Sequence, residues 1–60
     1  MQYNEAIEWC ENHNATVIFN HIASGVEIRS EVSWYPVKGN SFLAAVQRAM
    51  NIEERENERR

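Results

Sequence analysis

The sequence predicts a small α+β domain in which an antiparallel β-hairpin lies between two helices. Apolar residues recur at helical spacing in the first 13 residues, and they do so again from residue 42 onward. β-branched and aromatic residues concentrate over residues 16–22, and apolar and polar residues alternate over residues 26–34, which is typical of strands. We therefore expect one α-β-β-α domain over residues 1–52 with both helices on one face of the hairpin. Residues 53–60 would form a charged helix extension or a frayed tail.

The first helix is expected over residues 4–13. Its apolar arc consists of Tyr3, Ala6, Ile7, Trp9, Cys10 and His13. Asn4 is expected to cap its N-terminus, because a short polar side chain can accept a hydrogen bond from a free amide of the first turn. Asn14 is expected to follow the helix in the left-handed conformation that glycine usually adopts there.

The hairpin is expected to turn at Ser24-Gly25, with strands over residues 16–22 and 26–34. On the core side, the expected pairs are Ala15 with Trp34, Val17 with Val32, Phe19 with Ser30 and His21 with Ile28. On the open side, they are Thr16 with Ser33, Ile18 with Glu31, Asn20 with Arg29 and Ile22 with Glu27. Pro36 cannot donate to a ladder, so pairing is expected to stop by Tyr35.

The second helix is expected to start after a turn at Lys38-Gly39, with Asn40 or Ser41 as its cap. Its apolar side consists of Phe42, Leu43, Ala45, Val46, Ala49, Met50 and Ile52. Pairs such as Glu56 with Arg60 stabilise a helix by only about 0.2–0.5 kcal/mol each, so the packed part should end near Ile52. The expected core consists of Ile7, Phe19, Ile28, Val32, Trp34, Val46 and Ala49.

Composition restricts the class of protein. Of the 60 residues, 43% are hydrophobic and 25% are charged, which is ordinary globular usage. The longest apolar-rich run is about eight residues, whereas a helix that spans a bilayer needs about 20. The N-terminus lacks the basic and apolar regions of a signal peptide, and a single cysteine cannot form an internal disulfide. We therefore expect a cytoplasmic protein with no membrane association.

The sequence contains no recognisable catalytic constellation. Cys10 and His13 lie three residues apart, and a zinc site that adds His21 is conceivable, but no CxxC or HxxxH pair supports it. We interpret Cys10 as a buried thiol within the apolar stripe. The glutamates fall on polar faces or in the tail, whereas general acid–base catalysis requires a sheltered carboxylate. We therefore predict no catalytic residue, no cofactor and no metal in a protein that is not an enzyme.

An alternative function is binding of DNA or RNA through the polar side of the second helix and its entry loop. The candidate residues are Lys38, Gln47, Arg48, Asn51 and Arg55. Arg, Gln and Asn are side chains that read base edges in nucleic-acid grooves. The net charge is −3, however, and the long-range field of an acidic chain opposes a polyanion. Nucleic acid is therefore the alternative partner, not the first one.

The first strand is the candidate edge for self-association. Residues 16–22 include no acidic or basic residue (with His21 neutral), no proline and no glycine, whereas Glu27, Arg29 and Glu31 guard the second strand. Two copies that paired their first strands antiparallel would form a four-stranded sheet. The residues expected at this dimer edge are Thr16, Ile18, Asn20 and Ile22. Alternatively, the N-terminal residues or residues 35–37 could cover the edge within one chain.

Three runs resemble the small α-β-β-α proteins of phage and prophage accessory regions. They are residues 5–9, 15–17 and 39–46, with the sequences EAIEW, ATV and GNSFLAAV. The hairpin and the capped helix are also similar to HicB-type antitoxins, without their extra strand or DNA-binding tail. The phage resemblance implies a non-enzymatic protein of the host cytoplasm that modulates a partner protein. We therefore expect a homodimeric protein-binding module, with an antitoxin-like regulator as the alternative.

Overall fold

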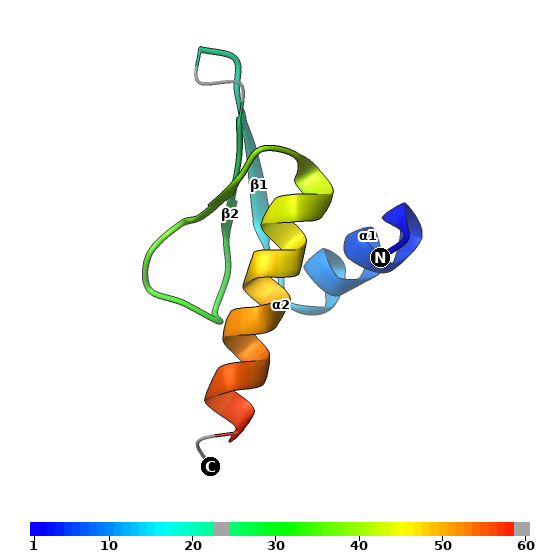
Figure 1. The fold of residues 1–60 in the computed structure, drawn as a ribbon, viewed down its shortest axis with the longest axis vertical. Helices are drawn as coiled ribbons and strands as arrows, with labels where there is room; N and C mark the ends of the chain where they lie inside the picture. The colour runs from blue at the N-terminus through cyan, green and yellow to red at the C-terminus, as the bar shows by residue number, and fades with distance from the viewer. Residues whose placement is uncertain (23–24, 59–60) are drawn as a thin grey trace.

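The computed structural model describes residues 1–22 and 25–58, which form two helices and a three-stranded antiparallel sheet (Figure 1). The elements are α1 (Tyr3–Asn12), β1 (Thr16–Asn20), β2 (Gly25–Arg29), β3 (Val37–Gly39) and α2 (Phe42–Glu58). The α+β class and the antiparallel hairpin between two helices are confirmed. The third strand, β3, was not expected from the sequence, and the observed order is α-β-β-β-α.

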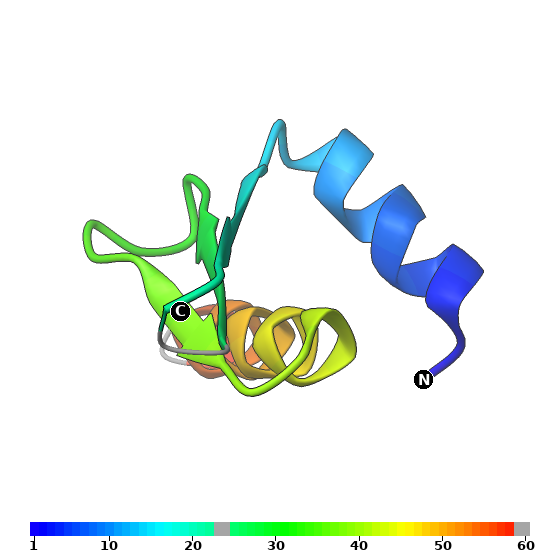
Figure 2. The same cartoon turned by 90° about the horizontal axis from the view of Figure 1, so that it is seen from above.

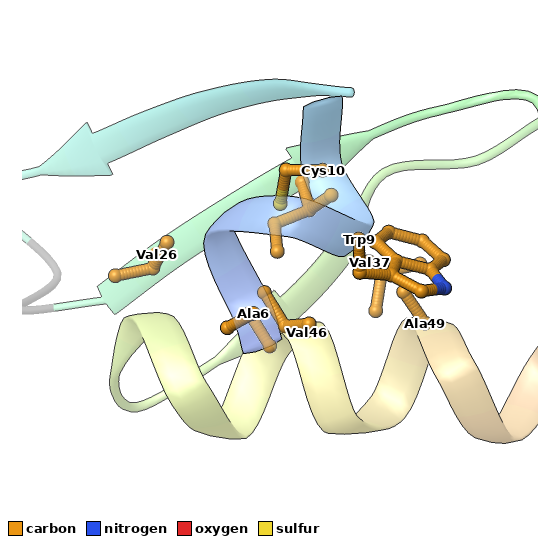
Figure 3. Close-up of a cluster of buried hydrophobic side chains, with 9 residues drawn as sticks. Ala6, Trp9, Cys10, Val26, Val37, Val46 and Ala49 are labelled. Carbon is orange, nitrogen blue, oxygen red and sulfur yellow. The ribbon is translucent and has the colours of Figure 1, made fainter. Parts of the chain in front are cut away.

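The two helices lie on the same side of the sheet (Figure 2). α2 packs against β2 and β3, whereas α1 packs mainly against α2. Side chains from both helices and from two strands meet in one core (Figure 3). The buried residues of this core are Ala6, Trp9, Cys10, Val26, Ile28, Val37, Ala45, Val46 and Ala49. α2 therefore holds the domain together, because it contacts both the sheet and the other helix.

β1 and β2 pair in a different register from the expected one. The observed pairs are Thr16 with Arg29, Val17 with Ile28, Ile18 with Glu27, Phe19 with Val26 and Asn20 with Gly25. The expected pairs Val17–Val32 and Phe19–Ser30 are therefore wrong by four residues, as are the others built on the same offset. Because the offset is even, the face on which each β1 side chain lies is unchanged. Gly25 begins β2 instead of completing the turn, and Ser24 lies outside the described residues.

β2 ends at Arg29, five residues before the expected end at Trp34. The chain then passes through a loop over residues 30–36, where the Ser33 hydroxyl donates to the Tyr35 carbonyl oxygen at 2.6 Å. A serine side chain that satisfies the backbone locally competes with a ladder. The alternation that suggested a long second strand therefore continues into a loop.

β3 pairs antiparallel with β2 and makes β2 the central strand of the sheet. The expected turn at Lys38-Gly39 is wrong, because both residues lie in β3. Gly39 also lies against the first turn of α2. A Cβ atom added to Gly39 would lie 2.5 Å from the backbone nitrogen of Ala45 and 2.8 Å from its Cα atom. Only glycine permits this close approach of β3 to α2.

Three residues expected in the core are exposed instead. Trp34 is 94% exposed, because it lies in the loop after β2, where no helix covers it. Phe19 is 60% exposed, because α2 covers β2 and β3 and not the outer strand, and Ile7 of α1 is 37% exposed beside the groove that separates α1 from β1. The expected core residues that are buried are Ile28, Val46 and Ala49, with Val32 partly buried against them.

Of the two predictions for the ends of α1, one is wrong and one is confirmed. The helix begins at Tyr3 after Gln2, which forms no side-chain cap bond, so the expected cap at Asn4 is wrong. Asn14 has a φ of 51° and is the only non-glycine residue with positive φ in the described part of the chain. The left-handed exit from the helix is therefore confirmed.

α2 begins as expected and continues beyond the expected end of its packed part. The Ser41 hydroxyl oxygen accepts a hydrogen bond from the backbone amide of Ala44 at 3.2 Å, so the serine cap is confirmed. The helix runs through Glu58. The expected partner of Glu56, Arg60, lies outside the described residues.

Candidate functional site

β1 forms one edge of the sheet, and among the described residues its outer side has no strand partner. The expected edge residues lie here, with Thr16, Ile18 and Asn20 in β1 and Ile22 just after it. Ile18 is 39% exposed and Ile22 is 98% exposed. Residues 35–37 do not cover this edge, because β3 pairs at the opposite side of β2. We call the outer side of Thr16–Asn20 the open edge.

The face of β1 that looks toward the helices is only partly covered. Phe19 lies opposite the buried Val26, yet its side chain is mostly exposed. Beside it, a groove of about 520 Å³ separates α1 from β1 and from the start of α2. The lining residues are Ile7, Cys10, Glu11, Asn14, Ala15, Val17 and Phe42. Exposed apolar surface therefore continues from this groove to the open edge.

A second groove of about 410 Å³ runs between α2 and the segment that enters β3. Its lining residues are Tyr35, Pro36, Val37, Lys38, Arg48, Asn51, Ile52 and Arg55, and we call it the basic groove. Four of the five candidate nucleic-acid residues are brought together here. The fifth, Gln47, lies beside it and donates from Nε2 to Oδ1 of Asn51 at 3.1 Å. Arg48 Nη1 donates to the carbonyl oxygen of Lys38 at 3.2 Å.

A third groove, on the other side of the loop after β2, is acidic. Its lining residues are Glu31, Val32, Ser33, Trp34, Glu53, Glu56 and Asn57. The Trp34 ring meets the ring of Tyr35 edge-on, with centroids 5.4 Å apart and an angle of 83° between the planes. This aromatic pair therefore separates the acidic groove from the basic groove.

A histidine at the end of α1 joins that helix to α2. The His13 ring stacks on Trp9 with centroids 4.2 Å apart, and its Nε2 atom contacts the Glu53 carboxylate. Trp9 Nε1 donates to the same carboxylate at 3.4 Å. Burial lowers the pKa of His13, but the Trp9 carbonyl and the carboxylates of Glu53 and Glu31 raise it, and the net shift is upward. Protonated His13 is thus a clamp between the helices.

Neither the conceivable zinc site nor a reactive thiol at Cys10 has support from the geometry of the described residues. Cys10 is 8% exposed, and burial raises the pKa of its thiol, which disfavours the reactive thiolate. The His13 ring is turned toward Trp9 and Glu53. Within residues 1–22 and 25–58, no group of three or more His, Cys, Asp and Glu side chains could hold a metal ion. Cys10 is part of the core.

Comparison with protein-family models, with curated proteins and with solved structures finds no match. No helix in the described part of the chain is long and apolar enough to cross a membrane. The functional assignment therefore rests on the surfaces above.

The exposed aromatic pair was not expected from the sequence, because Trp34 was placed in the core and Tyr35 at the end of strand pairing. Two serines within four residues, Ser30 and Ser33, directly before Trp34-Tyr35-Pro36, were the available signal for a loop. In the structure, both serine side chains hydrogen-bond to the backbone of that loop. An aromatic residue in such a loop lies at the surface unless another element covers it.

Proposed function

We propose that this chain is a small non-enzymatic protein-binding module that associates through the open edge of β1, in the first instance with a second copy of itself. The observation that carries the proposal is an uncharged five-residue edge strand whose helix-side Phe19 is 60% exposed. Unpaired backbone groups on an exposed edge are a template for another strand. The charged and short β3 is the less suitable edge, because it has three residues and includes Lys38.

Antiparallel pairing of two identical β1 strands satisfies twofold symmetry, since a residue near the start of one strand then meets a residue near the end of the other, and the reverse. The joined sheet would have six strands, in place of the four expected without β3. A phenylalanine buries on the order of 150–250 Å² when fully covered. Covering the exposed part of Phe19 would therefore contribute roughly 2–4 kcal/mol per copy. That is a large term for a domain of this size.

The accessory role implied by the phage resemblance, modulation of a host or phage protein, belongs to the same proposal. A partner that offered an extended segment would use the same main-chain hydrogen bonds as the second copy. Self-association and partner binding would then compete for one edge. The proposal therefore links partner binding to the monomer–dimer equilibrium.

The test is sedimentation of the full chain at tens of micromolar, with Phe19→Lys as the variant. An inward-pointing lysine on an edge strand opposes strand pairing. We expect the wild type to sediment as a dimer and Phe19→Lys as a monomer. The matched control is Trp34→Lys, which places the same charge at an exposed aromatic residue away from β1 and should leave the dimer intact.

Circular dichroism establishes that each variant is folded, and Ile18→Lys on the other face of β1 replaces Phe19→Lys if the latter unfolds. A wild-type protein that sediments as a monomer contradicts the proposed self-association. An equal loss of dimer in Trp34→Lys would move the interface away from β1.

A further inference from the structure

We infer that the basic groove binds single-stranded nucleic acid, with its cations on the phosphates and Tyr35 against a base. This inference concerns the β3 side of the sheet and is independent of self-association through β1. The basic groove lies between α2 and residues 35–38, at the opposite edge from the proposed dimer contact.

The cations of the described chain are concentrated in this groove. Among residues 1–22 and 25–58 there are four Lys and Arg side chains. Arg29 lies on β2 and donates from Nε to Glu27 at 3.3 Å. The other three, Lys38, Arg48 and Arg55, all line the basic groove, and no carboxylate is among its lining residues. The groove is therefore locally cationic in a chain of net charge −3.

The spacing of these groups suits an extended chain of phosphates. Arg48 and Arg55 are seven residues apart on α2, which is two helical turns or about 10 Å along the axis. Lys38 adds a third charge nearby, but its side chain lies on the opposite face of β3 from the buried Val37, beside Glu27 of β2. The hydrogen bond between Arg48 Nη1 and the Lys38 carbonyl oxygen uses one of the five guanidinium donors and holds that side chain in place.

The polar lining also presents donors. Asn51 lies one turn from each arginine on the same side of α2, and its Oδ1 atom already accepts from Gln47. Its Nδ2 group is then the end that can face a ligand. Guanidinium and amide N–H groups together match phosphate oxygens, which only accept. A groove of this kind selects an anion of several charges.

The aromatic pair distinguishes a nucleic acid from other polyanions. Tyr35 lines the basic groove and is 43% exposed, and the Trp34 ring meets it edge-on at 5.4 Å. Bases of single strands stack on exposed aromatic side chains, whereas bases within a duplex are already stacked. An acidic peptide would engage the cations but would not use the face of Tyr35. The ligand that uses both features is a single strand.

The test is fluorescence anisotropy of a labelled oligouridine of about ten nucleotides, within the range of single-strand site sizes, over a salt series with the full-length protein. Two phosphate contacts, by Arg48 and Arg55, predict that log K falls with log salt with a slope of about −1.4. Arg55→Gln should reduce that slope by about 0.7, and Arg48→Gln should act alike. Arg55→Gln leaves the bond between Arg48 and Lys38 in place, so it separates loss of charge from loss of structure.

Two variants complete the experiment. Arg29→Gln removes the same charge outside the groove and should bind as the wild type does. Tyr35→Leu keeps an apolar side chain and should weaken binding by about 5- to 150-fold without changing the slope.

Three outcomes would overturn the inference. They are no binding at low salt, equal losses in Arg29→Gln and Arg55→Gln, and equal binding of an oligouridine and a polyglutamate peptide of the same charge. Because Phe19 lies at the other edge, the Phe19→Lys variant should still bind the oligonucleotide, so failure of the dimer and failure of this site remain distinguishable.

Discussion

Ile28→Ala is expected to reduce the free energy of unfolding by about 2–5 kcal/mol, because it opens a cavity at the centre of the sheet. Ile28 is 0% exposed on the central strand, between its neighbours Val17 on β1 and Val37 on β3. The substitution removes three carbon atoms, which at about 0.8 kcal/mol each lose about 2.4 kcal/mol of transfer free energy before the cavity is counted. The whole stability of a 60-residue domain is about 3–9 kcal/mol.

The assay is thermal unfolding by circular dichroism at one fixed protein concentration, because a dimer would make Tm depend on concentration. A loss of about 3 kcal/mol corresponds to a fall in Tm of roughly 12–24 °C for a domain of this size. Ile28→Val should cost only about 0.5–1.5 kcal/mol. Trp34→Ala should leave Tm within a few degrees of the wild type, because Trp34 is almost fully exposed. If Trp34→Ala lowers Tm as much as Ile28→Ala does, the core described above is wrong, since a large effect at Trp34 is expected only if β2 continues to that residue and buries it.

Two further predictions concern contacts with α2. Because the pKa of His13 is raised in the folded state, its ion pair with Glu53 stabilises the domain fully below the ordinary pKa of 6.5, and this stabilisation is lost as the pH rises through the folded-state pKa. Tm should therefore fall over that pH range. The Glu53→Gln variant should show little of this fall. An equal fall in Glu53→Gln would exclude this ion pair as its cause. Gly39→Ala should destabilise the domain by about 1–3 kcal/mol in urea unfolding, because its Cβ would clash with the backbone of Ala45; an unchanged midpoint would contradict that close approach.

The parts of the fold that local chemistry determines could be predicted from the sequence. The 17-residue α2 repeats its apolar positions often enough to reveal the helical period. The left-handed Asn14 and the Ser41 cap follow from the side chains themselves, which satisfy or permit a particular backbone geometry. The cap predicted at Asn4 is wrong because the helix starts before it. The residue at that start, Gln2, forms no side-chain cap bond, so its side chain gave no signal.

The strands were harder, because alternation alone does not show where a strand stops. Residues 31–34 alternate polar and apolar side chains as a strand does, yet Ser30 and Ser33 bond to the loop backbone. β3 has only three residues, between Pro36 and the start of α2, too few for any period to appear. The register followed from the assumed turn at Ser24-Gly25, so an error of two residues in the position of the turn became an error of four residues in pairing.

The candidate surfaces differ in how far the sequence alone could predict them. The open edge was predictable, since the absence of charge on residues 16–22 is a property of the sequence alone. The cations of the basic groove were also identified as a set, because Arg48 and Arg55 share a side of one helix. The position of Tyr35 beside these cations could not be predicted, because it depends on the loop that leads from β2 to β3.

Net charge also led the sequence analysis to place nucleic acid second, and the structure weakens that argument. At physiological ionic strength the field of an exposed charge decays over about 8 Å. The molecule is 38 Å long, and α1, which bears Glu5, Glu8 and Glu11, lies on the far side of α2 from β3 (Figure 2). The α1 carboxylates oppose the approach of a polyanion mainly in low salt, whereas Glu53, Glu54, Glu56 and Glu58 lie on α2 itself and oppose it in physiological salt as well, although none of them lines the basic groove. A total of −3 therefore predicts slow, unsteered association, but it does not exclude a cationic groove from binding phosphate at short range.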